Sequence, residues 1–359
     1  MTRLPDVPLK LFLDDRDAFP QLLVLWLLFL EPLRFRVKLL CRFSAHPEPE
    51  SGSGFFVVDP SNPNFKDSRP MLNAKLAAKA HPTHRTVVRL TEEITIGDRQ
   101  LLIIGGPCSV ESFSQMEQVA TRLKPIAVQA LRGGVYKPRS SPYAFQGLGE
   151  AGLEILAAIR AESGLPVVTE VMAIAQIETV AAYADMLQIG SRNMHNFDLL
   201  KALGQVNKPV LLKRGLAATL EEFLLAAEYI LSHGNPNVVL CERGIRSFDS
   251  HTRNVLDLGT VVALKQISHL PVLVDPSHAA GKRELVPDLA RAAIACGADG
   301  LIIECHPAPE QSVSDARQAL SLTDMVDLVT SLDPIATAVG RSLMRPESTS
   351  LERSVLTAC

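Results

Sequence analysis

The chain has 359 residues, of which 47% are hydrophobic and 21% charged, and its formal net charge is -3. This composition is ordinary for a soluble enzyme with a sizeable core, and one α/β barrel of ~250 residues would account for most of the length. The small net charge favours neither nucleic acid nor a membrane surface as a partner.

The cysteine content indicates the redox setting. Six cysteines lie far apart and without regular spacing in a chain that is too large to need disulfide bonds. They are Cys41, Cys108, Cys241, Cys296, Cys305 and Cys359. This usage favours reduced thiols and a cytoplasmic location, and a cysteine with a special role is then expected to be catalytic or metal-bound.

Residues 1–66 form an irregular extension in which no helix or strand period persists, and we expect it to be disordered. Its apolar run Leu22–Leu30 has half of the ~18 residues that span a bilayer. The acidic residues before this run, such as Asp14 and Asp17, are untypical of a signal peptide. A targeting segment, a lineage-specific arm and translated upstream sequence before a start at Met71 are the alternatives.

Residues 67–100 are predicted to hold a lead-in segment and a β-hairpin. Two runs rich in β-branched residues, Thr86–Leu90 and Ile94–Ile96, are followed by a Gly-Asp turn at Gly97. Because this hairpin directly precedes the main domain, we expect it to cover the bottom of a barrel.

Residues 101–331 repeat a short apolar run, a loop with glycine or charge, and an amphipathic helical stretch. Eight runs are predicted as strands: Leu101–Ile104, Val128–Leu131, Pro166–Thr169, Met186–Ile189, Pro209–Leu212, Val238–Cys241, Pro271–Val274 and Gly300–Ile303. Intervening helices include Glu150–Glu162, Thr219–Ser232 and Val286–Cys296. Eight parallel strands buried on both faces favour a closed (β/α)8 TIM barrel.

An open Rossmann-type sheet is the alternative architecture. Against it, the loop Gly105–Ser109 after the first strand lacks the Gly-x-Gly-x-x-Gly signature of dinucleotide-binding sheets. After the barrel, residues 332–359 form a C-terminal tail that is too short for a helical chorismate mutase domain, and neither terminus has the period of a ferredoxin-like domain. We therefore expect no built-in regulatory domain.

Nearly every predicted strand ends in charged or reactive residues, and in a barrel these ends converge on one mouth. The predicted cations there are Arg132, Lys137, Arg139, Arg192, Lys213 and Arg243, with Arg246 as a further candidate. Acids such as Glu170 and Glu242 are too few to neutralise all of them. The mouth is therefore expected to bind a small, phosphorylated anion.

A second group at the strand ends could bind a metal. It consists of Cys108, His278, Glu304 and Asp315, which offer one soft, one borderline and two hard ligands. That mixture suits Mn, Fe, Co or Zn.

The period-two alternation of strands adds a check on this group. It places Glu304 and His306 on one face with Cys305 pointing away, and it likewise turns Cys241 away from Glu242. His306 is therefore the rival ligand, with a substrate contact as its other possible role.

Several motifs together resemble those of 3-deoxy-D-arabino-heptulosonate 7-phosphate (DAHP) synthase, in its compact microbial, class I beta-like branch. The resemblance covers about Met71 to Ser331. It is carried by Gly105–Glu111 (GGPCSVE), Arg132–Arg139 (RGGVYKPR), Gln188–Asn193 (QIGSRN), Leu211–Gly215 (LLKRG), Cys241–Gly244 (CERG) and Val274–His278 (VDPSH).

The resemblance implies a transferase that condenses phosphoenolpyruvate with erythrose 4-phosphate, the first step of the shikimate pathway to chorismate and the aromatic amino acids. It implies one divalent metal on Cys108, His278, Glu304 and Asp315. Phosphoenolpyruvate would be held by Arg132, Lys137, Ser191, Arg192, Lys213 and Arg243, and the aldose phosphate by Arg139 and Ser140. The catalytic residues would be Lys137 as proton donor, Glu170 orienting water or a cation, and Lys213. A homodimer or homotetramer is expected.

Two other functions are weighed against this one. The related 3-deoxy-D-manno-octulosonate 8-phosphate synthase, which uses arabinose 5-phosphate, usually has an Asn-Arg-Ser-Ser type loop where this chain has Lys137–Ser141 (KPRSS). The Lys-Pro-Arg form favours the four-carbon aldose. A catalytically silent barrel would be expected to lack a ligand or a cation, and none is visibly missing from the sequence.

Overall fold

The computed structural model describes residues 73–139 and 141–344. Eight parallel strands form a closed barrel in chain order, and the last, β10, pairs with the first, β3, with Leu301 opposite Ile103. The strands are β3 (Gln100–Gly106), β4 (Ala130–Arg132), β5 (Val167–Glu170), β6 (Met186–Ile189), β7 (Val210–Lys213), β8 (Val238–Glu242), β9 (Val272–Val274) and β10 (Gly300–His306). The predicted (β/α)8 barrel is confirmed.

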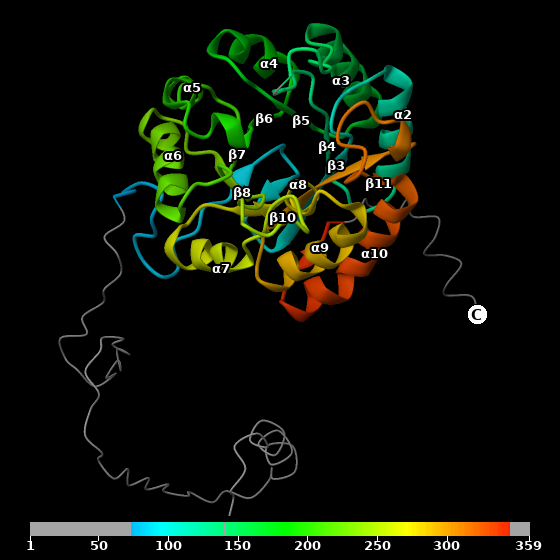
Figure 1. Cartoon of the computed structure of the whole chain (residues 1–359). Coiled ribbons are helices and arrows are strands. Elements are labelled where there is room, and N and C mark those ends of the chain that lie inside the picture. Colours follow the sequence, from blue (N-terminus) through cyan, green and yellow to red (C-terminus); the bar gives the residue numbers. More distant parts are fainter. Residues whose placement is uncertain (1–72, 140, 345–359) are drawn as a thin grey trace, which may run out of the picture. The chain divides into compact units, whose positions relative to one another are not determined.

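Helices surround the barrel, as Figure 1 shows. They are α2 (Phe113–Leu123), α3 (Glu150–Ser163), α4 (Ile177–Tyr183), α5 (Phe197–Leu203), α6 (Leu220–Ser232), α7 (Leu258–Ile267), α8 (Pro276–Ala280), α9 (Val286–Ala295) and α10 (Leu322–Ala338). Short 3-10 helices are η1 (Ile174–Gln176), η2 (Ser191–Asn193), η3 (Arg283–Leu285) and η4 (Pro309–Gln311). Local sequence fixes several helix starts; Thr219 and Glu222, for example, form a capping box at α6.

Three short pairings extend the barrel. β1 (Val88–Arg89) and β2 (Thr95–Ile96) form the predicted antiparallel hairpin. β11 (Leu320–Ser321) pairs with β10, and β12 (Ser342–Leu343) pairs with β3. Because α10 runs past residue 331 and β12 lies beyond it, the described fold continues past the predicted end of the barrel.

The barrel interior holds one apolar cluster, here called the inner cluster. Its buried members are Val88, Leu90, Ile96, Leu102, Ile104, Ala130, Val168, Met186, Leu211, Val239, Cys241, Leu273 and Ile302. Three of them, Val88, Leu90 and Ile96, come from the hairpin segment, so the hairpin closes the amino-terminal end of the barrel as expected. A larger apolar cluster fills the layer between strands and helices.

The alternation along each strand decides which polar residues enter the mouth. Leu211 lies in the inner cluster, so Lys213 faces inward on the same strand while Arg214 faces outward. Cys241 and Glu242 point to opposite faces, as the alternation predicts, and Cys241 is the one that belongs to the inner cluster. Glu242 instead faces outward, where its carboxylate pairs with Arg214 at 3.0 Å.

Within residues 73–139 and 141–344, none of the helices has the length and apolar character required to cross a bilayer. The apolar run Leu22–Leu30, the rest of residues 1–66, Met71 and the last residues of the tail lie outside the described part of the chain.

Candidate functional site

The four predicted metal ligands meet at the carboxyl end of the barrel. Cys108 follows β3, His278 lies in α8, Glu304 lies on the inward face of β10, and Asp315 lies in the loop after η4. One potential ligand atom from each lies within 4.8 Å of all the others. The Cys108 thiol donates a hydrogen bond to Asp315 Oδ2 at 3.1 Å, and His278 Nε2 lies 3.2 Å from Glu304 Oε1. This set fits a mid-series divalent metal.

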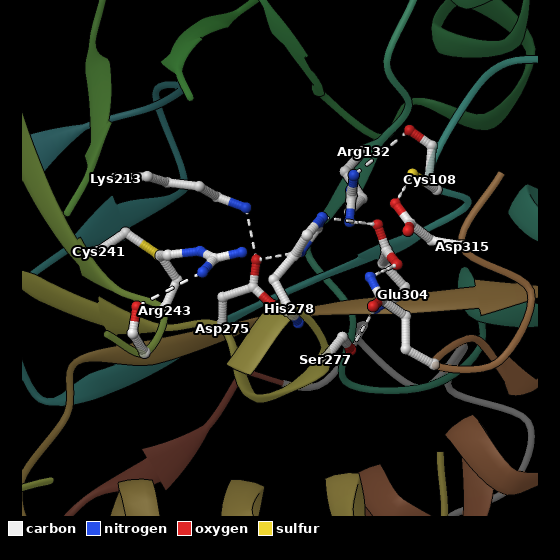
Figure 2. A network of polar contacts seen from close by, with 12 residues as sticks. Cys108, Arg132, Lys213, Cys241, Arg243, Asp275, Ser277, His278, Glu304 and Asp315 are labelled. Atoms are coloured by element: carbon white, nitrogen blue, oxygen red, sulfur yellow. Dashed lines mark hydrogen bonds and ion pairs between the residues drawn. The ribbon is translucent and has the colours of Figure 1, made fainter. Parts of the chain in front are cut away.

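Neighbouring charges orient two of these side chains, as Figure 2 shows. Asp275 caps α8 by accepting from the His278 backbone N–H, and its Oδ2 lies 2.7 Å from His278 Nδ1. The same oxygen accepts from Lys213 Nζ at 2.5 Å. Arg132 donates to Glu304 Oε1 at 2.6 Å. The imidazole nitrogen that faces the cluster is therefore Nε2, held in place by Asp275.

The backbone at Asp315 is unusual. Among the residues that the structure describes, it is the one non-glycine residue with a positive φ, at 54°. Asp tolerates this left-handed region better than most residues, and such conformations cluster at functional sites.

Burial and charge set the protonation of the cluster. Burial raises the pKa of the Cys108 thiol to about 12, and Glu304 adds to this effect while Lys137 opposes it. Burial lowers the pKa of His278, which favours neutral imidazole. Burial alone would raise the pKa of Glu304 and of Asp315, but the positive charge of Arg132 beside Glu304 and of Arg253 beside Asp315 lowers both. Two carboxylates and a neutral imidazole are ligand-competent forms, and Cys108 would release a proton on binding a metal.

A cavity of about 490 Å³ adjoins the cluster and includes His278 and Asp315 in its lining. Its cationic lining residues are Lys137, Arg139, Arg192, Lys213, Arg243, Arg246 and Arg253. The carboxylates in the lining are Glu170 and Asp315. This excess of positive charge suits a small polyanion, and the prediction that the strand-end cations gather at one mouth agrees with it.

The remaining predicted site residues lie as follows. Arg132 is buried behind the cavity lining, against Glu304. Lys137 Nζ donates to the Cys108 carbonyl oxygen at 2.7 Å and contacts its Sγ at 3.0 Å, so it lies between the cluster and the cavity. Ser191 begins η2 in the cavity wall. Ser140 lies outside the described residues.

Glu170 has one oxygen in use and one free in the described structure. Gln188 donates to its Oε2 at 3.2 Å, whereas its buried Oε1 has no hydrogen-bond partner. The close approach of this oxygen to the chain requires glycine at Gly190, where an added Cβ would meet it at 2.1 Å. An unpaired buried oxygen at a cavity wall suits a water or substrate hydroxyl.

His306, the predicted rival ligand, does not join the cluster. Its Nδ1 accepts from the Ala308 backbone N–H at 3.0 Å, and its Nε2 lies 3.5 Å from Glu111 Oε2. Glu111 Oε1 in turn accepts from the Val313 backbone N–H at 3.1 Å. His306 therefore belongs to contacts that anchor the loop before Asp315.

Two residues in the site were not predicted, and a third, Asp275, was predicted at the mouth as a strand-end acid but without a role. Its role could have been inferred, because it lies three residues before His278, where a helix-capping acid is common. Arg253 and Gln318 contact the carboxylates of Asp315 and Glu304. They lie in loops without a period, and no sequence pattern indicates which loop residues meet in space.

A model of the DAHP synthetase I family matches residues 85–338. The chain belongs to this family. A phospho-2-dehydro-3-deoxyheptonate aldolase from Thermotoga maritima is 50% identical over 266 residues, which cover 74% of this chain and 78% of that protein. The expected activity, that of a DAHP synthase and aldol-type transferase, is thereby confirmed.

Solved structures agree with this assignment to the DAHP synthetase I family. A crystal structure of the Thermotoga maritima aldolase (DAHP synthase) matches with a TM-score of 0.72 and 49% identity, covering 75% of this chain and 78% of that chain. A truncated form of 3-deoxy-D-arabino-heptulosonate 7-phosphate synthase from the same organism matches with a TM-score of 0.69 and 46% identity, covering 74% and 98%.

Relatives named for eight-carbon chemistry are more distant from this DAHP synthetase I chain. A 2-dehydro-3-deoxyphosphooctonate aldolase from Cupriavidus taiwanensis is 34% identical over 269 residues, which cover 68% of this chain and 92% of that protein. The higher identity to the seven-carbon enzyme agrees with the Lys-Pro-Arg loop at Lys137 and disfavours the eight-carbon alternative.

Proposed function

We propose that this chain is a metal-dependent DAHP synthase that condenses phosphoenolpyruvate with D-erythrose 4-phosphate and releases inorganic phosphate, in the first step of the shikimate pathway. The observation that carries the proposal is the cluster of four ligand atoms within 4.8 Å, beside a cavity lined mainly by cations. One Mn, Fe, Co or Zn ion on Cys108, His278, Glu304 and Asp315 would polarise the aldehyde carbonyl as a Lewis acid.

The cations divide between two phosphate groups. Arg192, Lys213 and Arg243 line the cavity and are proposed to bind phosphoenolpyruvate, with Lys137 and the backbone at Ser191. Arg132 is buried and forms an ion pair with Glu304, and it is proposed to add positive charge to this binding site.

The second phosphate group belongs to the aldose. Arg139 and Ser140 are proposed to bind it, because they lie on the loop after β4 that carries the Lys-Pro-Arg motif, and Arg139 lines the cavity. Arg139 Nε donates to the Phe145 carbonyl oxygen at 3.3 Å, which leaves its outer nitrogens available to a phosphate.

The chain's own residues can move the protons that the reaction needs. C3 of the enol attacks the aldehyde carbon, and the aldehyde oxygen then takes a proton, for which Lys137 Nζ is the proposed donor. Positive charge develops at C2, where water adds. The free Oε1 of Glu170 is proposed to orient that water and to accept its proton. The resulting hemiketal phosphate collapses to the C2 ketone: its hydroxyl gives up its proton as the bond from C2 to the phosphate oxygen breaks, and the proton leaves with inorganic phosphate.

Lys213 and Asp275 form a buried ion pair beside the proposed binding site for phosphoenolpyruvate. The Lys213 ammonium is buried and ion-paired with Asp275, which also holds His278. A cation fixed by a buried carboxylate is pre-organised for the phosphoenolpyruvate anion and needs little rearrangement when that anion binds. Lys213 is therefore proposed to act in catalysis as well as in binding.

A reducing, cytoplasmic location is part of the proposal. The described cysteines Cys108, Cys241, Cys296 and Cys305 are free thiols, and a thiol ligand at Cys108 must stay reduced to bind a metal.

Substrate choice is the direct test. Purified enzyme assayed with phosphoenolpyruvate should show a higher kcat/KM for erythrose 4-phosphate than for arabinose 5-phosphate. Arg139→Ala should raise KM for the aldose phosphate by about tenfold or more and leave KM for phosphoenolpyruvate within twofold, because a charge-assisted phosphate contact is worth about 1.5–3 kcal/mol. Arg89→Ala, which removes an exposed arginine at the closed end, is the matched control. Faster consumption of arabinose 5-phosphate by the unaltered enzyme would overturn the assignment.

A further inference from the structure

Arg253 contacts one candidate ligand directly and reaches a second through one side chain. Its Nη1 donates to Asp315 Oδ1 at 3.1 Å and to Gln318 Oε1 at 3.0 Å. Gln318 Nε2 donates in turn to Glu304 Oε2 at 2.5 Å. A single guanidinium nitrogen thus links the carboxylates of Asp315 and Glu304. In each carboxylate this link uses the oxygen that does not contact Cys108 or His278.

The segment that carries Arg253 is also fixed against the helix that carries His278. The Arg253 backbone N–H donates to Ala280 at 3.0 Å, and Asn254 Nδ2 donates to the His278 carbonyl oxygen at 3.1 Å. Gly281, with a φ of 67°, allows this contact, because a Cβ there would meet Arg253 Cβ at 2.6 Å. The loop between β8 and α7 is therefore docked on α8 at the point where Arg253 projects.

We propose that Arg253 is a positioning residue of the metal site: it holds Asp315, and through Gln318 also Glu304, in the orientation that binds the ion. This inference rests on the proposed metal-dependent function. Side chains that orient metal ligands typically contribute 10- to 100-fold to metal affinity. Arg253 has to hold a carboxylate in a left-handed loop residue, where the backbone alone does not favour the required conformation.

A competing role for Arg253 is contact with the aldose phosphate, because its side chain is 42% exposed and lines the cavity. The two roles differ in what they change. Positioning alters the affinity of the substrate-free protein for metal, whereas a phosphate contact alters KM for the aldose and leaves that affinity unchanged.

The experiment measures the dissociation constant of Co²⁺ or Zn²⁺ for metal-stripped enzyme, by competition with a chelating dye and without substrate. Arg253→Gln should raise this constant by about 10- to 100-fold. Arg253→Lys keeps the charge beside Asp315 and should give a smaller rise. Gln318→Leu breaks the link to Glu304 alone and should raise the constant by more than twofold but by less than Arg253→Gln does.

Arg317→Gln is the matched control. Arg317 is exposed in the same loop as Asp315 and Gln318, and no contact of its side chain with a candidate ligand exists within the described ranges. Removing this charge should leave the metal dissociation constant within twofold. Thermal unfolding of each metal-free variant checks that the barrel is intact.

A dissociation constant for Arg253→Gln within twofold of the parent overturns the inference, including the case in which KM for the aldose phosphate rises instead. Should Arg253→Gln fail to fold, Gln318→Leu and Arg253→Lys decide by the same criterion, since each retains part of the network. If the parent enzyme itself binds no metal that depends on Cys108, the proposed metal site fails, and this inference fails with it.

Discussion

The two ends of the barrel are built from the same strands but hold opposite kinds of side chain. At the closed end the hairpin and the strand starts bury an apolar cluster that includes Ile96 and Ile302. Two residues beyond Ile302, Glu304 is fully buried at the mouth as a charged group. Burying apolar side chains at the closed end stabilises the folded state, whereas burying charged groups at the mouth costs folding free energy. The closed end therefore contributes stability, and the mouth holds the groups that carry out chemistry.

The buried cations at the mouth differ in whether a carboxylate neutralises them. Arg132 pairs with Glu304 and Lys213 with Asp275, so each of these buried cations has a carboxylate within hydrogen-bond distance. Arg243 is equally buried, yet among the described residues its side chain contacts the Gly244 carbonyl oxygen and forms no ion pair. Burial lowers the pKa of Arg243, as expected for a cation awaiting an anionic ligand.

The largest expected effect tests the mouth. Cys108→Ser should lower kcat/KM by on the order of 1,000-fold, because Lewis-acid activation is worth several kcal/mol. It should also remove bound metal, while the denaturation midpoint of the metal-free protein stays nearly unchanged. Metal content by elemental analysis and steady-state kinetics measure this. Cys296→Ser, a change at the end of α9, is the control. Full metal content and turnover in Cys108→Ser would show that the mouth does not use this thiol.

The second prediction makes the same substitution, Arg→Met, at two arginines that follow neighbouring strands. Arg214→Met leaves the fully buried Glu242 without its cation and should lower the free energy of unfolding by about 3–4 kcal/mol. Arg243→Met removes a buried cation that has no ion pair, and should leave stability unchanged or raise it by about 1 kcal/mol. Denaturant unfolding measures both.

Kinetics complete this comparison. Arg243→Met should raise KM for phosphoenolpyruvate in spite of its intact stability, since Arg243 lines the cavity. An equal loss of stability in both variants would mean that the inward and outward faces of the wall do not differ as the structure indicates.

A third prediction addresses the closed end. Ile96→Ala removes a fully buried side chain from the inner cluster and should lower the free energy of unfolding by about 2–4 kcal/mol. Because Ile96 lies far along the strands from the mouth, kcat/KM per folded molecule should stay within twofold. Val87→Ala, an exposed change in the same hairpin segment, is the control. A large change in kcat/KM would show that the two ends are coupled.

The sequence predicted the parts of this molecule that depend on periodicity. Eight apolar runs gave eight strands, and the strand-end position of Lys213 and Glu304 placed them at the mouth. Alternation put Cys241 and Glu242 on opposite faces but did not decide which of them faces inward, because a one-residue shift in phase reverses every side chain and a short apolar run does not fix that phase. Arg253 was missed for a different reason: its contacts depend on how two loops meet.

The smallest expected effect concerns the rim of the mouth, where solvent reaches the charges. Asp257 caps α7 through the Thr260 backbone N–H and pairs with Arg214 at 3.0 Å. Partial burial alone would raise the pKa of Asp257, but hydrogen bonds from Thr260 and Arg214 lower it below its usual value. The unfolded chain then takes up the proton first as the pH falls. The stabilisation is therefore present above about pH 4 and lost as the pH falls through the lowered pKa.

Asp257→Asn removes the charge of this side chain and keeps its helix cap. Asn caps helices about as well as Asp, so the variant should lose the ion pair alone, at a cost of about 1 kcal/mol at pH 7. Urea unfolding at pH 7 and near pH 3 should show the difference between variant and parent shrinking in acid, because the parent then loses the same contribution. Asp327→Asn, at an exposed position of α10 that forms no ion pair with any described residue, is the control and should show no such trend. A difference that stays constant with pH would show that it does not arise from the charge of Asp257, and the ion pair with Arg214 would then contribute little to stability.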